Sequence, residues 1–303
     1  MLINKQCLKS DLLLLTAAAI WGFAFVAQRT GMEYVGPFTY TGVRFLLGAV
    51  SLLPLLYFFK DSPPDTTLKP LSLFWRRWGG VAAGLLLFVG ISLQQVGLVY
   101  TTAGKAGFIT GLYVVLVPVF GLALRHNSGK AIWLGALVAA AGLYLLSVNS
   151  DFRVAFGDFL VFVGAIAWAC HVLAISWLSP HNHPVRFSII QFCITGVISL
   201  IIAFCVETVS LNGICNGAIP ILYGGIMSAG VAFTLQVIVQ KTAHPAHAAI
   251  ILSLEAVFAA LGGWLLLNEQ MGTRAILGCV LMLAGMFIAQ LSNRPGKTAA
   301  ETI

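Results

Sequence analysis

The sequence predicts an all-α integral membrane protein of ten transmembrane helices, arranged as two inverted five-helix repeats. Three observations predict this fold class: an apolar composition, ten apolar segments of about 20 residues, and an internal repeat. Of the 303 residues, 59% are apolar and 9% are charged, and the mean hydropathy is +0.94. Because a soluble domain is about one quarter charged, this chain lacks the polar residues that would cover a water-facing surface.

The apolar segments each have a length that crosses about 30 Å of hydrocarbon. They predict helices over residues 11–28, 36–59, 78–100, 104–124, 130–148, 156–177, 184–206, 217–240, 245–267 and 273–291. The first segment follows two lysines, as a signal peptide would, but nine similar segments follow it. The polar pair Gln28-Arg29 also ends a full-length span. We therefore interpret this segment as the first transmembrane helix.

The repeat relates residues 1–150 to residues 151–303, which we interpret as two units of five helices each. Residues in the first unit recur 147 positions later in the same order: Asp11, Trp21, Pro37 and Phe45 as Asp158, Trp168, Pro184 and Phe192. Gln95 recurs as Gln236, at a shift of 141. Since each unit has an odd number of spans, the second must run inverted in the membrane. Inverted repeats are common in transporters with alternating access.

The net charge of +7 indicates membrane topology rather than a nucleic-acid partner, because the chain has no long basic run and no nucleic-acid motif. Twelve of the 17 Lys and Arg residues lie on the side of the termini and the even-numbered connections. Four lie on the opposite side, and Arg44 lies within a helix. Positive charge marks the cytoplasmic side. The count predicts a multi-pass protein of a bacterial-type inner membrane with both termini in the cytoplasm.

The chain resembles the drug/metabolite transporter superfamily in its ten-helix EamA branch, over essentially the whole length. The motifs that support the resemblance are Ala19-Ile20-Trp21-Gly22, Arg44-Phe45, Pro118-Val119-Phe120, Leu254-Glu255-Ala256-Val257-Phe258, Asn268-Glu269 and two terminal Leu-Gly…Gly helices. Two departures are Ala256, where the family often has proline, and Arg125-His126, where it often has an acidic residue. The missing proline leaves open whether the ninth helix kinks at Glu255.

The resemblance implies transport of a small metabolite, often as export, with amino acids and related compounds as the first expectation. Uptake of a vitamin or nucleoside, multidrug efflux and, in a different class, a channel are the alternatives. The sequence has no HExxH, G-x-S-x-G or glycine-rich phosphate motif. We therefore expect no enzymatic activity, no cofactor and no metal. The remaining histidines, His247 among them, are interpreted as solvated residues of the connections.

Two charged residues within the predicted helices are candidates for substrate binding. A charge at the membrane centre costs about 3 kcal/mol on insertion scales, so it is expected to be neutralised, paired or hydrated. Glu255 lies near the middle of the ninth helix and Arg44 lies about two and a half turns into the second. Glu255 is interpreted as a proton-titrating or ammonium-binding group, and Arg44 as a carboxylate-binding group. The alternative for both is a structural ion pair with each other, and Arg44 could also join helices through backbone carbonyl groups.

Five further polar or aromatic residues complete the predicted site. Trp21 and Trp168 are related by the repeat and fall in mid-helix, which favours a position beside a central cavity. His171 shares the helix face of Trp168, and is either a titrating group, which would couple transport to protons, or a packing residue. Gln95 and Gln236 either bind substrate or join helices. The fifth and tenth helices are interpreted as a scaffold or as a homodimer face.

Overall fold

The computed structural model describes residues 5–58, 71–101, 103–124, 128–147, 156–267 and 272–290, and these residues form helices and no strands. The predicted all-α fold class is confirmed. Three predicted helix ends, at residues 59, 148 and 291, lie outside the described residues, as do the Arg125-His126 and Asn268-Glu269 pairs.

The first half contains five spans, and its fourth span is built from two helices. The helices are α1 Lys5–Gly31, α2 Pro37–Phe58, α3 Leu73–Tyr100, α4 Ala103–Gly111, α5 Tyr113–Ala123 and α6 Lys130–Ser147.

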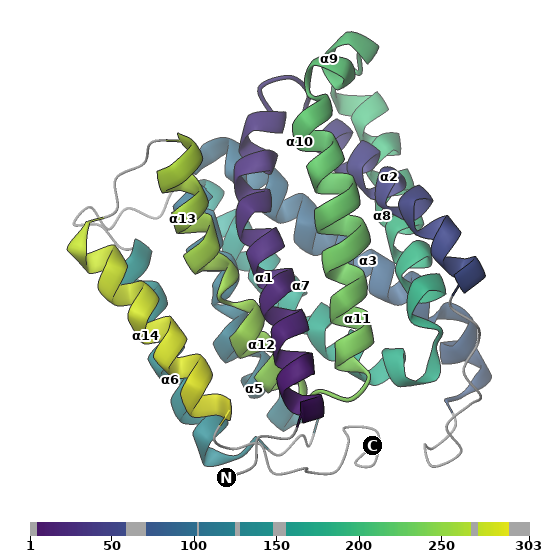
Figure 1. Ribbon diagram of the computed structural model, residues 1–303. Coiled ribbons are helices and arrows are strands. Elements are labelled where there is room, and N and C mark those ends of the chain that lie inside the picture. The colour runs from purple at the N-terminus through teal and green to yellow at the C-terminus, as the bar shows by residue number, and fades with distance from the viewer. Residues whose placement is uncertain are drawn as a thin grey trace.

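The second half also contains five spans, of which the eighth and ninth are composite. Its elements are α7 Phe156–Leu178, the 3-10 turn η1 Ser179–His181, α8 Pro184–Val206, α9 Leu211–Asn216, α10 Ala218–Leu222, the π-helix η2 Tyr223–Phe233, α11 Thr234–Gln240, α12 Pro245–Leu252, α13 Glu255–Leu267 and α14 Thr273–Gln290. The eighth span comprises α10, η2 and α11, and the short helix α9 precedes it at the upper end of the molecule (Figure 1).

The fourth and ninth spans are interrupted near their middle, where the sequence predicts continuous helices over 104–124 and 245–267. The interruptions lie at Leu112 and at Ser253 with Leu254. Leu112 and Ser253 are 141 positions apart, the shift that also relates Gln95 to Gln236. Interrupted helices at corresponding positions of two inverted halves commonly surround a central site. The ninth span therefore breaks at Glu255 although Ala256 replaces the proline.

Helices of the two halves pack in pairs that the repeat relates. Helix α1 contacts α13, and its counterpart α7 contacts α4 and α5. Helix α3 contacts α7, and the corresponding span of the second half, η2 with α11, contacts α1. The pairs α2–α8 and α6–α14 join equivalent helices. Helices α6 and α14 lie at one side of the bundle (Figure 1) and approach closely at glycines, since a Cβ on Gly142 would lie 2.6 Å from the Gly278 carbonyl oxygen.

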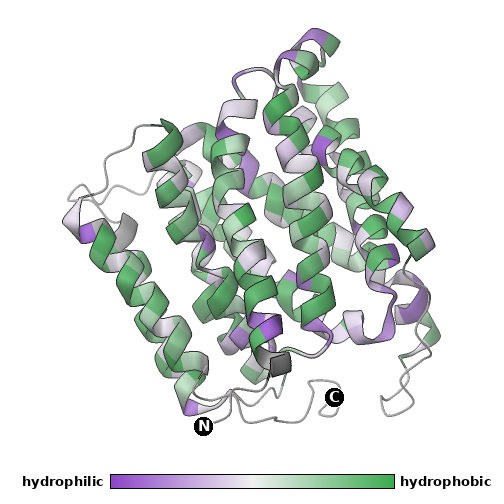
Figure 2. Ribbon diagram, viewed as in Figure 1, coloured by the Kyte–Doolittle hydropathy of each residue, from purple (hydrophilic) through white to green (hydrophobic). Residues whose placement is uncertain are grey.

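The helices are hydrophobic along most of their length (Figure 2), and many of their large apolar side chains are exposed. Among their side chains, Val50, Phe204 and Leu265 have exposed fractions of 59%, 71% and 58%. Such exposure is unfavourable in water and favourable in lipid. Eight described helical spans are long and apolar enough to cross a membrane, and residues 130–145 and 276–289 form two shorter apolar helices. Together they make the ten helices that the sequence predicts.

Candidate functional site

A central cavity lies between the two halves, at the level where the fourth and ninth spans are interrupted. Its volume is about 40 Å³, a measure on which one water molecule needs about 10–15 Å³. Residues of α1, α2, α3, α7, η2 and α11 line it, together with residues beside the two interruptions. The cavity as described holds a few water molecules, so a metabolite enters only if the helices move apart.

Five of the seven predicted site residues line this cavity: Trp21, Arg44, Trp168, Gln236 and Glu255. Gln95 and His171 are fully buried nearby and are not part of the lining. The structure therefore brings most of the predicted residues together, and whether any of them binds substrate stays a prediction.

Each of the two tryptophans donates a hydrogen bond from the first helix of its half to the third span of the other half, although the acceptors differ in kind. Trp21 Nε1 donates to the Ser228 carbonyl oxygen in η2 at 3.2 Å, and Trp168 Nε1 donates to Gln94 Oε1 in α3 at 3.0 Å. Phe233 lies between them, with ring centroids 4.6 Å from Trp21 and 5.9 Å from Trp168. These three rings form an aromatic wall, to which both halves contribute.

A network of amides extends from this wall. Gln94 Nε2 donates to Gln28 Oε1 at 3.1 Å, and Gln94 Oε1 also accepts a long hydrogen bond of 3.5 Å from Thr110 Oγ1. All three residues line the cavity. The network joins α1, α3, α4 and α7, and it satisfies polar groups that would otherwise be buried without partners.

Glu255 and Arg44 place opposite charges in the wall of the same cavity. Their exposed fractions are 5% and 1%. Within the described part of the chain, no ion pair joins them. Arg44 Nε and Nη2 have no hydrogen-bond partner among these residues, and neither has Glu255 Oε1 apart from its neighbour Tyr113. The described residues therefore do not form the Arg44–Glu255 ion pair that was the alternative to substrate binding.

Local structure explains how each charge is held. Glu255 is the first residue of α13, where the helix dipole favours a negative charge. The Arg44 guanidinium carbon lies 5.2 Å from the ring centroid of Tyr40 and 4.9 Å from that of Phe45. Aromatic faces at this distance attract a cation. The interruption of the ninth span and the aromatic surroundings of the second thus reduce the cost of burying both groups.

His171 lies behind the aromatic wall rather than in the cavity. Its Nε2 is 2.8 Å from Gln191 Oε1, and its ring meets those of Trp168 and Phe233 edge-on at 5.7 and 6.2 Å. This position supports the wall.

The sequence analysis missed several cavity residues, chiefly Gln28, Gln94, Tyr113, Ser228 and Phe233. Gln94 gives the clearest lesson, because adjacent residues of an α-helix point about 100° apart and only one of the Gln94-Gln95 pair can face the cavity. Tyr113 opens α5 much as Glu255 opens α13. A search for paired interruptions in the fourth and ninth spans would have identified Tyr113 as a cavity residue.

Comparisons with known proteins agree with this architecture. The sequence model of the EamA-like transporter family matches residues 8–148 and again residues 155–290. An uncharacterised transporter of Archaeoglobus fulgidus is 32% identical over 288 residues, which cover 94% of this chain and 86% of that protein. The uncharacterised transporter YoaV of Bacillus subtilis is 24% identical over 284 residues, which cover 91% and 94%. One crystal structure, at 19% identity, shares the fold with a TM-score of 0.75 and covers 93% of this chain and 96% of that chain.

Proposed function

Because the chain belongs to the EamA-like transporter family and is a multi-pass membrane transporter, we propose that it is a secondary transporter that exports amino acids or related small metabolites. The units of alternating access are the two repeats, residues 1–150 and 151–303. The membrane is a bacterial-type inner membrane, with both termini in the cytoplasm.

The observation that supports this substrate class is the pair of opposite charges in one cavity, neither of which has an ion-pair partner among the described residues. A buried charge without a partner is strongly unfavourable. Arg44 presents a guanidinium that matches a carboxylate, and Glu255 presents a carboxylate that matches an ammonium group. A zwitterion satisfies both at once. The wall of Trp21, Trp168 and Phe233 offers an apolar and aromatic surface for the rest of the molecule.

The small cavity volume supports alternating access rather than a permanently open path. A cavity of about 40 Å³ admits a few water molecules, whereas an amino acid is larger. We propose that the bundle of spans 1–4 and that of spans 6–9 rock to open each end in turn, with α6 and α14 as a scaffold. Glu255 then either exchanges a proton during the cycle or binds the substrate ammonium group alone.

The test compares metabolites inside cells and in the medium for strains that express the parent protein or the Glu255→Gln variant. We expect at least one amino acid or related zwitterion to be enriched outside with the parent, and this enrichment to fall about tenfold or more in the variant, as for a buried charge contact worth 1.5–3 kcal/mol. Arg44→Gln is expected to act in the same direction. Glu33→Gln removes an exposed carboxylate that does not line the cavity, and it serves as the control.

Reconstitution in liposomes then separates the alternatives. Accumulation against a gradient supports a transporter, and dissipative flux alone would indicate a channel. A vitamin or nucleoside enriched inside cells would show uptake instead of export. Efflux of unrelated apolar cations would show multidrug transport instead of zwitterion transport. If Glu255→Gln and Arg44→Gln variants reach the membrane and transport like the parent, the site assignment is wrong.

A further inference from the structure

Two repeat-related carboxylates tie the bundle together at its opposite ends. Asp11 lies in the second turn of α1, and Asp158, 147 positions later, lies in the first turn of α7. Both are buried, with exposed fractions of 9% and 8%. A buried carboxylate needs hydrogen-bond donors, and each finds one in the other half of the chain.

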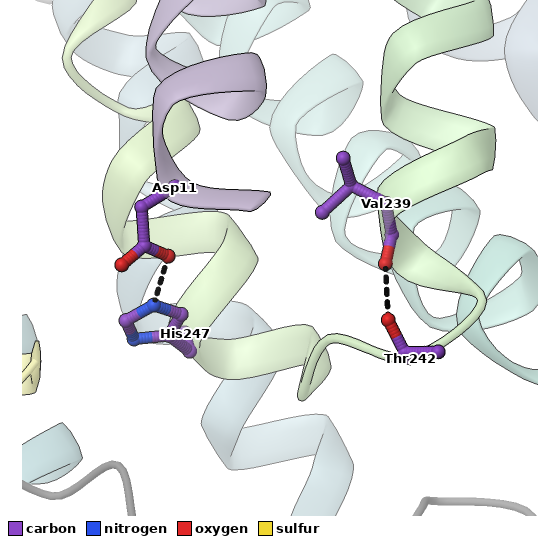
Figure 3. A network of polar contacts seen from close by, with 4 residues as sticks. All are labelled: Asp11, Val239, Thr242 and His247. Atoms are coloured by element: carbon purple, nitrogen blue, oxygen red, sulfur yellow. Dashed lines mark hydrogen bonds and ion pairs between the residues drawn. The ribbon is translucent and has the colours of Figure 1, made fainter. Parts of the chain in front are cut away.

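At the lower end, Asp11 Oδ1 lies 2.8 Å from His247 Nε2 (Figure 3). His247 belongs to α12, the first half-helix of the ninth span, and its exposed fraction is 4%. The expectation that it is a solvated residue of a connection is therefore wrong. The turn before α12 is short, and in it Thr242 Oγ1 donates to the Val239 carbonyl oxygen at 3.5 Å (Figure 3).

At the upper end, Thr101 Oγ1 donates to Asp158 Oδ1 at 2.6 Å. Thr101 lies between α3 and α4, directly before the first half-helix of the fourth span. Arg29 Nη1 donates to the Thr101 carbonyl oxygen at 3.2 Å, which places this contact at the far end of α1 from Asp11. Asp11 and Arg29 are 18 positions apart in α1, about 27 Å at 1.5 Å per residue. Each acid thus joins the first helix of its own half to the start of the fourth span of the other half.

The cavity lies between the two contacts. Trp21 and Trp168 each follow the acid of their helix by ten positions, about 15 Å along the axis, and both line the cavity. Each tethered half-helix is separated from the rest of its span by an interruption, at Leu112 for α4 and at Ser253 and Leu254 for α12. A half-helix bounded in this way can move while its other half keeps its packing.

We propose that Asp11–His247 and Asp158–Thr101 are equivalent latches that close opposite ends of the central cavity, and that they open in alternation as α12 and α4 move. This inference rests on the alternating access of the proposed function. Inverted repeats exchange their conformations when the transporter changes the side to which it opens. Contacts related by the repeat therefore break on opposite sides, and loss of one latch shifts the population toward the state that is open at that end.

The test measures the conformational equilibrium directly and needs no substrate. Ser228, a small residue of the cavity wall, is replaced by cysteine in a chain whose six native cysteines are replaced by serine or alanine. A membrane-impermeant maleimide is added to proteoliposomes from one side or from the other. Asp11→Ala is expected to raise the ratio of labelling from the Asp11 end to labelling from the Asp158 end about fivefold or more, as loss of one net hydrogen bond would. Asp158→Ala is expected to lower this ratio by a similar factor.

Variants of the residues that contact the two acids, His247 and Thr101, test each latch a second time. His247→Ala is expected to shift the ratio as Asp11→Ala does, and Thr101→Val as Asp158→Ala does. Each double variant should shift it by less than the sum of its two single variants, because both single variants remove the same contact. Thr16→Ala removes a bond within α1 only, from Thr16 Oγ1 to the Leu12 carbonyl oxygen, and should leave the ratio unchanged. If an alanine variant does not fold, the asparagine variant of the same acid replaces it.

The proposal is overturned if both acids shift the ratio in the same direction, or if the folded variants leave it at the parental value. The labelling result is independent of transport. Opposite shifts in a protein that moves none of the tested metabolites would support the latches and contradict the proposed substrates. Zwitterion transport with an unchanged ratio would do the reverse.

Discussion

Gln94 and Gln95 are neighbours in α3 with opposite hydrogen-bonding environments. Gln94 bonds with Gln28 and Trp168. Gln95 is fully buried, and neither its Nε2 nor its Oε1 has a hydrogen-bond partner among the described residues. A buried polar group without a partner costs about 1–3 kcal/mol.

The two amides are therefore expected to respond in opposite ways to replacement by leucine, which has a similar volume. Gln94→Leu should lower the free energy of unfolding by about 1–3 kcal/mol, because it removes the donor to Gln28 Oε1 and the acceptor of the Trp168 indole N–H. Gln95→Leu should leave stability unchanged or raise it. Thermal unfolding in detergent measures both. Equal destabilisation by the two variants would show that Gln95 has a partner after all.

The repeat predicted which tryptophans face the cavity but not which glutamine does. Trp21 and Trp168 both line it, whereas Gln236 does so and its counterpart Gln95 does not. The π-helix η2 precedes Gln236, while the equivalent part of α3 is a continuous α-helix. Because a π-helix closes its hydrogen bonds one residue later than an α-helix, residues beyond it turn to a different face. Sequence matching between the halves does not reveal such a change.

At the scale of the helices, apolar length predicted the spans well and their interruptions not at all. Lipid leaves a spanning segment no backbone partner except its own, so an apolar run of about 20 residues predicts a helix. Gly111 directly precedes the break at Leu112, but glycine also occurs inside continuous helices of this chain, and no glycine or proline lies next to Ser253 or Leu254. Ser253 Oγ donates to the Ile250 carbonyl oxygen at 2.8 Å and so satisfies a group at the break. Helices α1 and α7 pack against the interrupted spans, and apolar length alone does not predict this packing.

The close contact of α6 with α14 leads to a prediction on stability. A Cβ on Gly142 would lie 2.6 Å from the Gly278 carbonyl oxygen and 2.8 Å from the Met282 backbone nitrogen, whereas a Cβ on Gly104 would meet nothing within 4 Å. Gly142→Ala must push the two backbones apart and should lower the free energy of unfolding by about 1–3 kcal/mol. Gly104→Ala should be neutral or stabilising by up to about 1 kcal/mol, since alanine favours helix.

Thermal unfolding of the two alanine variants, with the parent as reference, decides this point. Neither glycine lines the cavity, so the difference reports helix packing alone. Equal stability of the two variants would mean that α6 and α14 are not held at the distance described.

Over the whole molecule, symmetry and its violation have separate consequences. The repeat accounts for features that occur twice: the tryptophan hydrogen bonds, the interrupted spans and the buried acids at opposite ends. The charges of the cavity occur once each, since Arg44 has Gln191 at its repeat-related position. The two halves can exchange their conformations because these features occur in both. The single Arg44 and the single Glu255 give the cavity one positive and one negative side, as binding of a zwitterion requires.

Orientation in the membrane is the remaining property of the whole molecule that the charge distribution predicts. Twelve Lys and Arg residues on one side against four on the other favour a cytoplasmic location for the lower end of Figure 1. Cys215 lies at the other end, in α9. Its side chain is exposed, and a Cβ on Gly213 of the same helix would lie 2.6 Å from the Tyr34 carbonyl oxygen beyond the end of α1. It therefore reports on the opposite side of the membrane.

A chain with Cys215 as its only cysteine should react with a membrane-impermeant maleimide in intact spheroplasts. A matched chain carries Lys241→Cys as its only cysteine, and this residue lies in the turn between α11 and α12, at the lower end. It should react only after lysis. The reverse pattern would place both termini outside the cytoplasm and contradict the orientation that the charge distribution predicts. Reaction of both chains in intact spheroplasts would mean that the single span between Cys215 and Lys241 does not cross the membrane as described.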